Sequence, residues 1–319
     1  MPYSSDSCPI CAAENSSVKA GEIVFSAGII KEARQCSDCE SYYLYPAPNP
    51  AEIGQVYHPQ YFRDFFENYW KDIYRGKVIG GKLSKLRATG NYLDVGCAIG
   101  SMLTEIKETC DWQVFGIELD PTAAEYARKR GLVIFSQPLE QLPLEANFFD
   151  YIFANNVIEH IPRPQSFFET IRRVLKPGGI LHLATPNGAI DIYPSLKLAL
   201  ALNPLPTRHA GHVNFFTKKG LVKIAQANGF EITSLKEFHF KTALKQKLFW
   251  PGSQKKILKE LNRSRQSLPQ PELDLSSYER LIPPRPPGWY LLTRAWWKSL
   301  CKALPLPVGA DFDVRLRKL

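Results

Sequence analysis

Four of the seven cysteines form two Cys-x-x-Cys pairs, Cys8 with Cys11 and Cys36 with Cys39, and 24 residues separate the pairs. A cytosolic chain keeps its thiols reduced, so this spacing favours a metal over disulfides. Two such turns supply the four thiolates that structural zinc takes in tetrahedral geometry, and a hairpin over EIVFSAG can fill the interval between them. The sequence therefore predicts a structural zinc ribbon. Its site has no open position for catalysis.

A glycine-containing loop, LDVGCAIG, follows an apolar run and supplies Asp94, Gly96 and Gly100. A glycine directly after a strand lets the chain turn tightly and lets a ligand approach the backbone. Glu118 ends the next apolar run, 22 residues after Gly96, and a carboxylate there can accept both hydroxyls of an adenosine ribose. The dinucleotide fingerprint would need glycines at 96, 98 and 101. Its failure here argues against a pyrophosphate ligand.

Histidines follow the later apolar runs. His160 stands beside Glu159 in NNVIEHIP, and His209 and His212 lie in RHAGHVNFF. Imidazole can accept a proton near neutral pH, so His160 and His212 are candidate general bases. A structural or cofactor-supporting role fits the same residues and stays open. His182, inside the apolar run ILHLA, is expected in the core.

Strand-like and helix-like patterns alternate between residues 90 and 240. This alternation predicts a doubly wound, mostly parallel sheet, in which ligands lie beyond the carboxyl ends of the strands where the strand order reverses. The expected strands are 91–96, 114–120, 149–156, 179–187 and 231–240, and the expected helices are 101–110, 121–131, 165–179 and 218–230.

The motifs LDVGCAIG, GIELDP, FFDYIFANNVIEHI, VLKPGGILHLATPN and HVNFFTKKGLVKIAQANGFEI occur in this order over residues 90–237. The series resembles the S-adenosylmethionine-dependent methyltransferases of the Rossmann-like class, particularly those that methylate quinone precursors and sugars. Ala98 departs from the glycine usual in that family and narrows the loop. The resemblance implies that Asp94, Gly96 and Gly100 form the cofactor loop, Glu118 holds the ribose, Leu119 and Leu139 flank the adenine, and Asn155 approaches the methionine end.

The expected fold class is α/β, a doubly wound Rossmann-like sheet with a small N-terminal zinc ribbon and a basic C-terminal extension. The expected units are the ribbon (1–46), a helical bridge (47–88), the methyltransferase domain (89–240) and the extension (241–319). The extension holds 9 of the 25 prolines and offers no clean strand pattern, so the position of a seventh strand stays open.

The net charge of +9 is concentrated in the extension. Residues 1–240 carry 24 Lys and Arg against 25 Asp and Glu, whereas residues 241–319 carry 16 against 6. Because residues 1–240 are close to electrically neutral, the charge distribution weighs against nucleic acid as a partner without excluding it.

The segment 288–304, plotted as a helix, has a cationic stripe opposite tryptophans, which fits either the lipid interface or packing on the core. The N-terminus lacks a signal-peptide pattern, so a cytoplasmic protein is expected, with peripheral membrane contact open.

The leading functional hypothesis is methyl transfer to a small molecule, either a sugar or glycan precursor or an aromatic hydroxyl. Residues 155–158 read Asn-Asn-Val-Ile rather than the Asn/Asp-Pro-Pro-aromatic loop typical of methyltransferases that act on base amines. Between Cys110 and Cys301 there is no cysteine nucleophile for methylation of cytosine carbon 5. Zinc ribbons accompany this domain in sugar-modifying enzymes and in ribosomal RNA methyltransferases. Two alternatives therefore stay open: an RNA methyltransferase using the ribbon and basic tail, and a catalytically silent binding protein.

Overall fold

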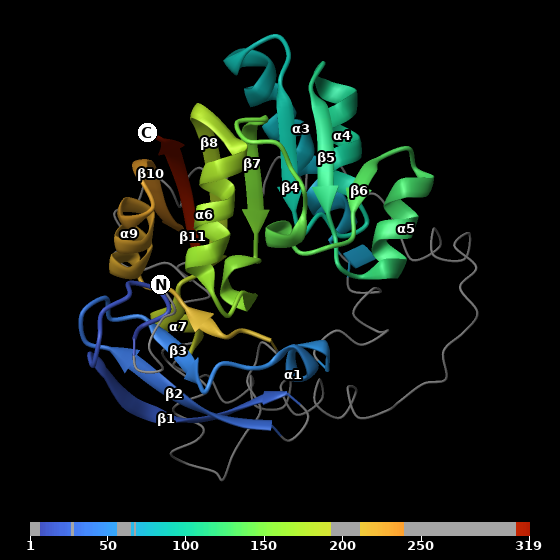
Figure 1. Cartoon of the computed structure of the whole chain (residues 1–319). Coiled ribbons are helices and arrows are strands. Elements are labelled where there is room, and N and C mark those ends of the chain that lie inside the picture. Colours follow the sequence, from blue (N-terminus) through green and yellow to red (C-terminus); the bar gives the residue numbers. More distant parts are fainter. Residues whose placement is uncertain (1–6, 27–28, 56–64, 67, 193–210, 239–310) are drawn as a thin grey trace, which may run out of the picture.

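The computed structural model of the chain describes residues 7–26, 29–55, 65–66, 68–192, 211–238 and 311–319. These residues form two sheets, a four-stranded sheet with the order β1-β2-β3-β9 and a seven-stranded sheet with the order β10-β11-β8-β7-β4-β5-β6. The smaller sheet lies below the larger one in Figure 1. The larger sheet confirms the predicted α/β fold.

The small sheet is built from the N-terminal segment. Strands β1 (Ser17–Ser26) and β2 (Ile29–Cys36) form the hairpin predicted between the two cysteine pairs, and β3 (Tyr42–Tyr45) pairs antiparallel with β2. The fourth strand, β9 (Asn214–Phe215), comes from far along the chain and pairs antiparallel with β3. Two units that the sequence predicted as separate domains therefore share one sheet.

The large sheet has the predicted parallel centre. Strands β4 (Asn91–Val95), β5 (Gln113–Ile117) and β6 (Val133–Phe135) run outward in one direction, and β7 (Phe149–Asn155) and β8 (Leu175–Pro186) run outward in the other. The strand order thus reverses between β4 and β7. In such sheets this point is where ligands bind, beyond the carboxyl ends of the strands.

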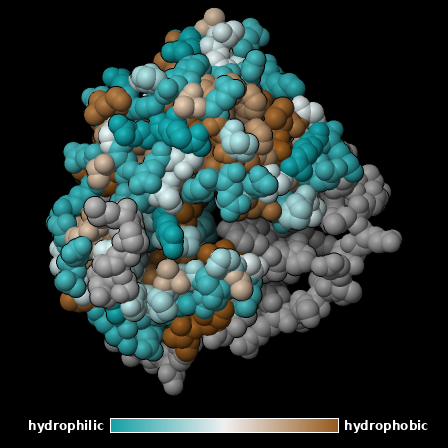
Figure 2. Space-filling view, in the orientation of Figure 1, coloured by the Kyte–Doolittle hydropathy of each residue, from teal (hydrophilic) through white to brown (hydrophobic). Residues whose placement is uncertain are grey.

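Helices cover both faces of the large sheet. On one face α3 (Tyr69–Leu86), α4 (Ser101–Thr109) and α5 (Pro121–Lys129) pack with Tyr92, Tyr151 and Phe153. On the other, α6 (Pro164–Val174) and α9 (Lys218–Ala227) pack with Leu93, Ile152 and Leu181. The outward surfaces of α6 and α9 are mostly hydrophilic (Figure 2), as amphipathic packing requires. The shorter helices are α1 (Pro50–Gly54), α7 (Gly188–Asp191), η1 (Leu139–Gln141) and η2 (Ile158–His160).

The edge of the sheet holds the main difference from the sequence-based expectation. Strand β10 (Phe230–Phe238) pairs with β11 (Asp311–Lys318), and β11 also pairs antiparallel with β8. The seventh strand therefore comes from the end of the segment that its composition assigns to the basic extension. The sequence of β11 does alternate, with Phe312, Val314 and Leu316 facing the core between charged residues, as in a half-buried antiparallel strand. The prediction missed this strand because the segment was judged by its basic, proline-rich composition. The segment 288–304 lies outside the described residues, and its membrane contact stays a prediction. Among the helices that are described, none is long and apolar enough to cross a membrane.

Candidate functional site

The glycine loop lies at the predicted place, directly after β4. Gly96 and Gly100 have φ angles of 74° and 72°, in the left-handed region that favours glycine. A Cβ atom on Gly96 would stand 2.8 Å from the Cγ2 atom of Val157, which belongs to the loop after β7. The loops after β4 and β7 are therefore in contact at the switch point. Ala98 also has a positive φ, 50°, where an alanine is strained and the family's usual glycine would not be.

Glu118 closes this loop from the end of β5. Its carboxylate accepts hydrogen bonds from the backbone N–H groups of Ala98 and Asp120, both at 2.8 Å. Burial raises the pKa of the Glu118 carboxyl. A carboxylate has about four acceptor positions, so two such bonds leave capacity for the two hydroxyls of a ribose. This acceptor capacity fits the role in ribose binding that the resemblance implies for Glu118.

A second buried carboxylate, Asp94, stands at the end of β4. Burial raises its pKa well above the ordinary value, and the nearby Asp72 of α3 raises it further, whereas Arg75 opposes the shift. Arg75 also forms an ion pair with Asp72 at 2.8 Å. The sequence predicted Asp94 but missed the contribution of α3, because nothing in the helical pattern of the bridge marks these charges as facing β4.

The remaining predicted cofactor residues lie around the same edge but in different surroundings. Leu119 is half exposed, whereas Leu139, in η1, is buried in the core of the α6 face. Asn155 ends β7 and is paired in register with Ala184 of β8. The hydroxyl of Ser101, at the start of α4, is buried without a hydrogen-bond partner among the described residues. That hydroxyl is a further polar group available to a ligand of the loop.

The two predicted catalytic histidines are brought together. The rings of His160 and His212 meet edge to face with centroids 4.8 Å apart. His160 Nδ1 lies 3.0 Å from the carbonyl oxygen of Gly211, which can only accept, so Nδ1 carries the proton of the neutral ring. This tautomer leaves Nε2 as the basic nitrogen. His160 itself is half-buried, at the end of the loop that contacts Gly96.

His212 is buried and held by carboxylates. Its Nδ1 lies 2.7 Å from Oδ2 of Asp191, and its Nε2 lies 4.0 Å from Oε1 of Glu159. Although burial lowers the pKa of His212, the effect of Asp191 and Glu159 is larger and raises it. Burial raises the pKa of Glu159 to about 7, and Thr185 donates a hydrogen bond of 2.9 Å to its Oε2. Asp191 escaped the sequence analysis because it lies in a segment that reads only as a loop.

The two other histidines considered in the sequence are His182 and His209. His182 is buried on β8 between Tyr151, at 2.8 Å from its Nδ1, and Asp313 of β11, which confirms the expected core position. His209 lies outside the described residues, within the range 193–210. Glu159, His160 and His212 each offer one donor atom within 4.8 Å of the others, so a divalent metal could also use this group.

The four paired cysteines converge in the ribbon. The Sγ atoms of Cys8 and Cys39 are 3.8 Å apart, and those of Cys11 and Cys36 are 3.6 Å apart. Four thiolates at about 2.3 Å from a zinc ion stand roughly 3.8 Å from one another, so the arrangement fits tetrahedral zinc. The contact between Cys8 and Cys39 raises the pKa of the first thiol and lowers that of the second to about 5. The four predicted ligands therefore lie in one cluster, with Sγ–Sγ distances compatible with zinc.

Comparisons with known proteins bear on the family and the fold of the central domain. The profile of a family described as "Methyltransferase domain" matches residues 73–235, which are 163 of the 319 residues. A ubiquinone biosynthesis O-methyltransferase of Caulobacter vibrioides is 39% identical over 33% of this chain and 44% of its own length. A probable S-adenosylmethionine-dependent methyltransferase of Mycolicibacterium smegmatis is 30% identical over 54% of this chain and 64% of its own length. The matches thus span about half to two thirds of these relatives.

A solved structure shows the same fold. Phosphoethanolamine N-methyltransferase 2 of Haemonchus contortus, determined with S-adenosyl-L-methionine, aligns with a TM-score of 0.52 and 18% identity over 87% of this chain and 62% of its own. The matched family region contains the glycine loop, Glu118 and both loops at the switch point. This chain therefore belongs to the methyltransferase domain family and has the Rossmann-like fold of S-adenosylmethionine-dependent methyltransferases.

Proposed function

We propose that this protein transfers a methyl group from S-adenosylmethionine to a hydroxyl group of a small molecule. Family membership and the position of the glycine loop support the cofactor. The relatives named as ubiquinone biosynthesis O-methyltransferases support an oxygen acceptor. The proposed acceptor is a sugar or glycan precursor or an aromatic hydroxyl, as the sequence motifs suggested.

The cofactor would lie across the ends of β4 and β5. S-adenosylmethionine supplies an electrophilic methyl group on a positively charged sulfur. Glu118 has acceptor capacity for the ribose, and Asp94 offers a buried carboxylate to the positively charged end. Asp72 adds negative charge near Asp94, so a cation placed there would be attracted by both carboxylates and would lower the pKa of Asp94, which burial and Asp72 raise. Leu119 and Leu139 stay assigned to the adenine, and Asn155 to the methionine end.

His160 is the proposed general base. Transfer to a hydroxyl requires removal of the hydroxyl proton as the oxygen attacks, and an imidazole near neutral pH does this efficiently. One observation carries the assignment: His160 Nδ1 is bound to the Gly211 carbonyl at 3.0 Å, so its basic nitrogen is Nε2. The loop that bears it also touches the cofactor loop through Val157.

His212 and Asp191 complete the proposed site. Asp191 fixes the ring of His212 at 2.7 Å and favours its protonated form. The edge of one imidazole against the face of the other then fixes the orientation of His160. The sequence suggested His212 as a second base. Its burial and raised pKa suit it better to orienting His160 and to balancing the charge of Glu159.

Zinc at Cys8, Cys11, Cys36 and Cys39 is proposed as structural. Four thiolates fill the coordination sphere, so no position is left for substrate. Elemental analysis should find one zinc per chain. A second bound metal that Glu159→Gln removes would instead assign the group of Glu159, His160 and His212 to metal binding.

The direct test is label transfer. The purified full chain, incubated with methyl-labelled S-adenosylmethionine and a cell extract, should place label in a small-molecule fraction, and His160→Ala should place little there. Label that ribonuclease releases from RNA would support the RNA alternative. In that case the binding of RNA to the protein should weaken steeply with salt. Cofactor binding without transfer to any fraction would favour a silent binding protein.

A further inference from the structure

The ribbon and the candidate site are joined by continuous backbone hydrogen bonds. Strand β3 pairs with β9 in the register Tyr42 with Phe215 and Tyr43 with Asn214. The N–H group of Leu44 extends this pairing by donating to the carbonyl of Val213 at 3.0 Å. The segment after His212 is thus held as an added strand of the ribbon sheet.

The same segment holds the loop that carries His160. The N–H group of Val213 donates to the carbonyl of Glu159 at 2.8 Å, and the side chain of Asn214 donates to the carbonyl of Ile161 at 2.7 Å. These two bonds bracket His160, whose own Nδ1 is held by Gly211 at 3.0 Å. Val213 therefore binds the ribbon through its carbonyl and the His160 loop through its N–H.

The hydrogen bonds between the ribbon and the His160 loop also extend to the cysteine cluster. Thr217 donates its hydroxyl proton to the carbonyl of the predicted metal ligand Cys39 at 2.6 Å, and its backbone N–H donates to the hydroxyl of Ser41 at 3.1 Å. Ser41 in turn accepts a hydrogen bond at its carbonyl from the N–H of Cys36, at 2.9 Å. Both Ser41 and Cys39 are fully buried.

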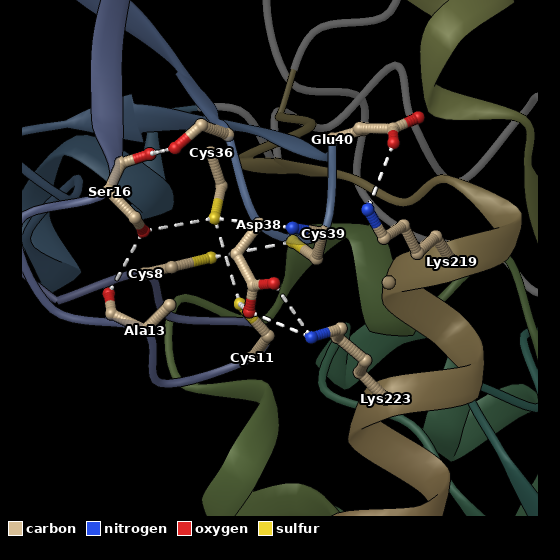
Figure 3. Close-up of polar contacts among 12 residues, drawn as sticks. Cys8, Cys11, Ala13, Ser16, Cys36, Asp38, Cys39, Glu40, Lys219 and Lys223 are labelled. Carbon is tan, nitrogen blue, oxygen red and sulfur yellow. Dashed lines mark hydrogen bonds and ion pairs between the residues drawn. The ribbon is translucent and has the colours of Figure 1, made fainter.

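Charge strengthens the same contact. Figure 3 shows Lys223 and Lys219 of α9 reaching Asp38 and Glu40 of the second cysteine turn, at 2.8 and 3.0 Å. Zinc with four thiolates carries a net charge of about −2, which would attract Lys223, a cation that already interacts with Cys11 and Cys39. A loaded cluster should therefore draw α9, and the residues before it, toward the ribbon.

From these contacts we propose that the metal-loaded ribbon is the positioning element of the candidate active site. Its cysteine cluster fixes Ser41 and β3, these fix residues 211–217, and that segment fixes His160 and His212. The catalytic consequence rests on the proposed function, whereas the mechanical link does not. Val213, Asn214 and Thr217 are positioning residues, since each acts through the loop that bears His160.

Hydrogen exchange on the full chain tests the link without any assay of methyl transfer. After the metal is removed with a chelator, amide exchange should rise by roughly five- to tenfold across residues 158–161 and 213–217, the effect expected from the loss of one hydrogen bond. Exchange in β5, residues 113–117, should stay unchanged. Unchanged protection of residues 158–161 in the metal-free chain would overturn the proposal.

A matched pair of variants tests the link with the metal in place. Thr217→Val removes the hydroxyl that binds Cys39 and caps the start of α9, whereas Thr217→Ser retains both contacts. Thr217→Val should keep its zinc and its affinity for S-adenosylmethionine within about twofold, yet lose roughly five- to tenfold in kcat and in protection of residues 158–161. Thr217→Ser should restore both.

These variants also decide the case in which the metal-free chain unfolds. Equal kcat and equal exchange in the two Thr217 variants would overturn the proposal. A loaded wild-type chain that transfers no methyl group would refute the proposed function instead, while altered exchange at residues 158–161 would still establish the link.

Discussion

Replacing Gly96 with alanine should destabilise the fold and push the glycine loop after β4 away from the loop after β7. The φ of 74° costs a non-glycine residue about 1–2 kcal/mol. The new Cβ would also stand 2.8 Å from Val157 Cγ2, and relieving such overpacking costs about 1–3 kcal/mol. The two effects together predict a loss of roughly 2–5 kcal/mol in the free energy of unfolding.

Urea denaturation followed by circular dichroism measures this loss, and the chain offers a matched control. Gly81 lies inside α3, and a Cβ atom added there would meet nothing within 4 Å, so Gly81→Ala should stabilise by about 0.5–1 kcal/mol through helix propensity. Adding Val157→Ala to Gly96→Ala should relieve only the steric contribution to the loss of stability. In a double-mutant cycle this appears as a favourable coupling of about 1–2 kcal/mol.

The reasoning about the loop would be refuted if Gly96→Ala and Gly81→Ala changed the stability equally. If Gly96→Ala lowered the free energy of unfolding without any coupling to Val157, the whole loss would come from the positive φ of the backbone. In that case the contact between the loops after β4 and β7 would not be the source of the strain.

The remaining predictions concern the metal, the histidines and pH. Purified protein should carry one zinc, and chelation should raise the number of titratable thiols by four; no increase on chelation would contradict the metal site. His160→Ala should lower turnover by about 10²–10⁴ with cofactor affinity intact, and lost affinity would indicate a structural role. Asp191→Asn should shift the pH profile of kcat, because it removes the carboxylate that raises the pKa of His212; an unmoved profile would exclude that role. Burial lowers the pKa of His182 below 6.5, so the unfolded chain binds that proton more readily and this residue's contribution to stability should fall as pH decreases below 6.5. His182→Gln should flatten that part of the stability curve measured by urea denaturation, and an unchanged slope would contradict the assignment.

The sheet centre and the glycine loop were predictable because their signals are local. The strand β4, Gly96, Gly100 and the capped start of α5 at Asp120 can each be inferred from a few neighbouring residues. The cysteine cluster was predictable for a similar reason, since each Cys-x-x-Cys turn presents two ligands by itself.

The parts that escaped prediction depend on pairing across long stretches of sequence. Strand β9 has two residues and is a strand only because β3 lies beside it. Strand β11 pairs with β8 and β10 across a segment whose composition suggested only a basic tail. Asp191 matters because its carboxylate meets His212 in space, 21 residues further along the chain, and no spacing rule brings such a pair together.

Calorimetric titration of S-adenosylmethionine into the full chain, beside Glu118→Ala, tests the central claim most directly. We predict one-to-one binding by the wild type and a loss of about 1.5–3 kcal/mol in the variant, which removes a charged acceptor from the ribose. The same variant also frees the N–H groups of Ala98 and Asp120. Ala98→Gly keeps Glu118 and both of these bonds, so it controls for a side-chain change in the loop alone and should not lose affinity. No binding to the wild type, or equal affinity in Glu118→Ala, would contradict the account.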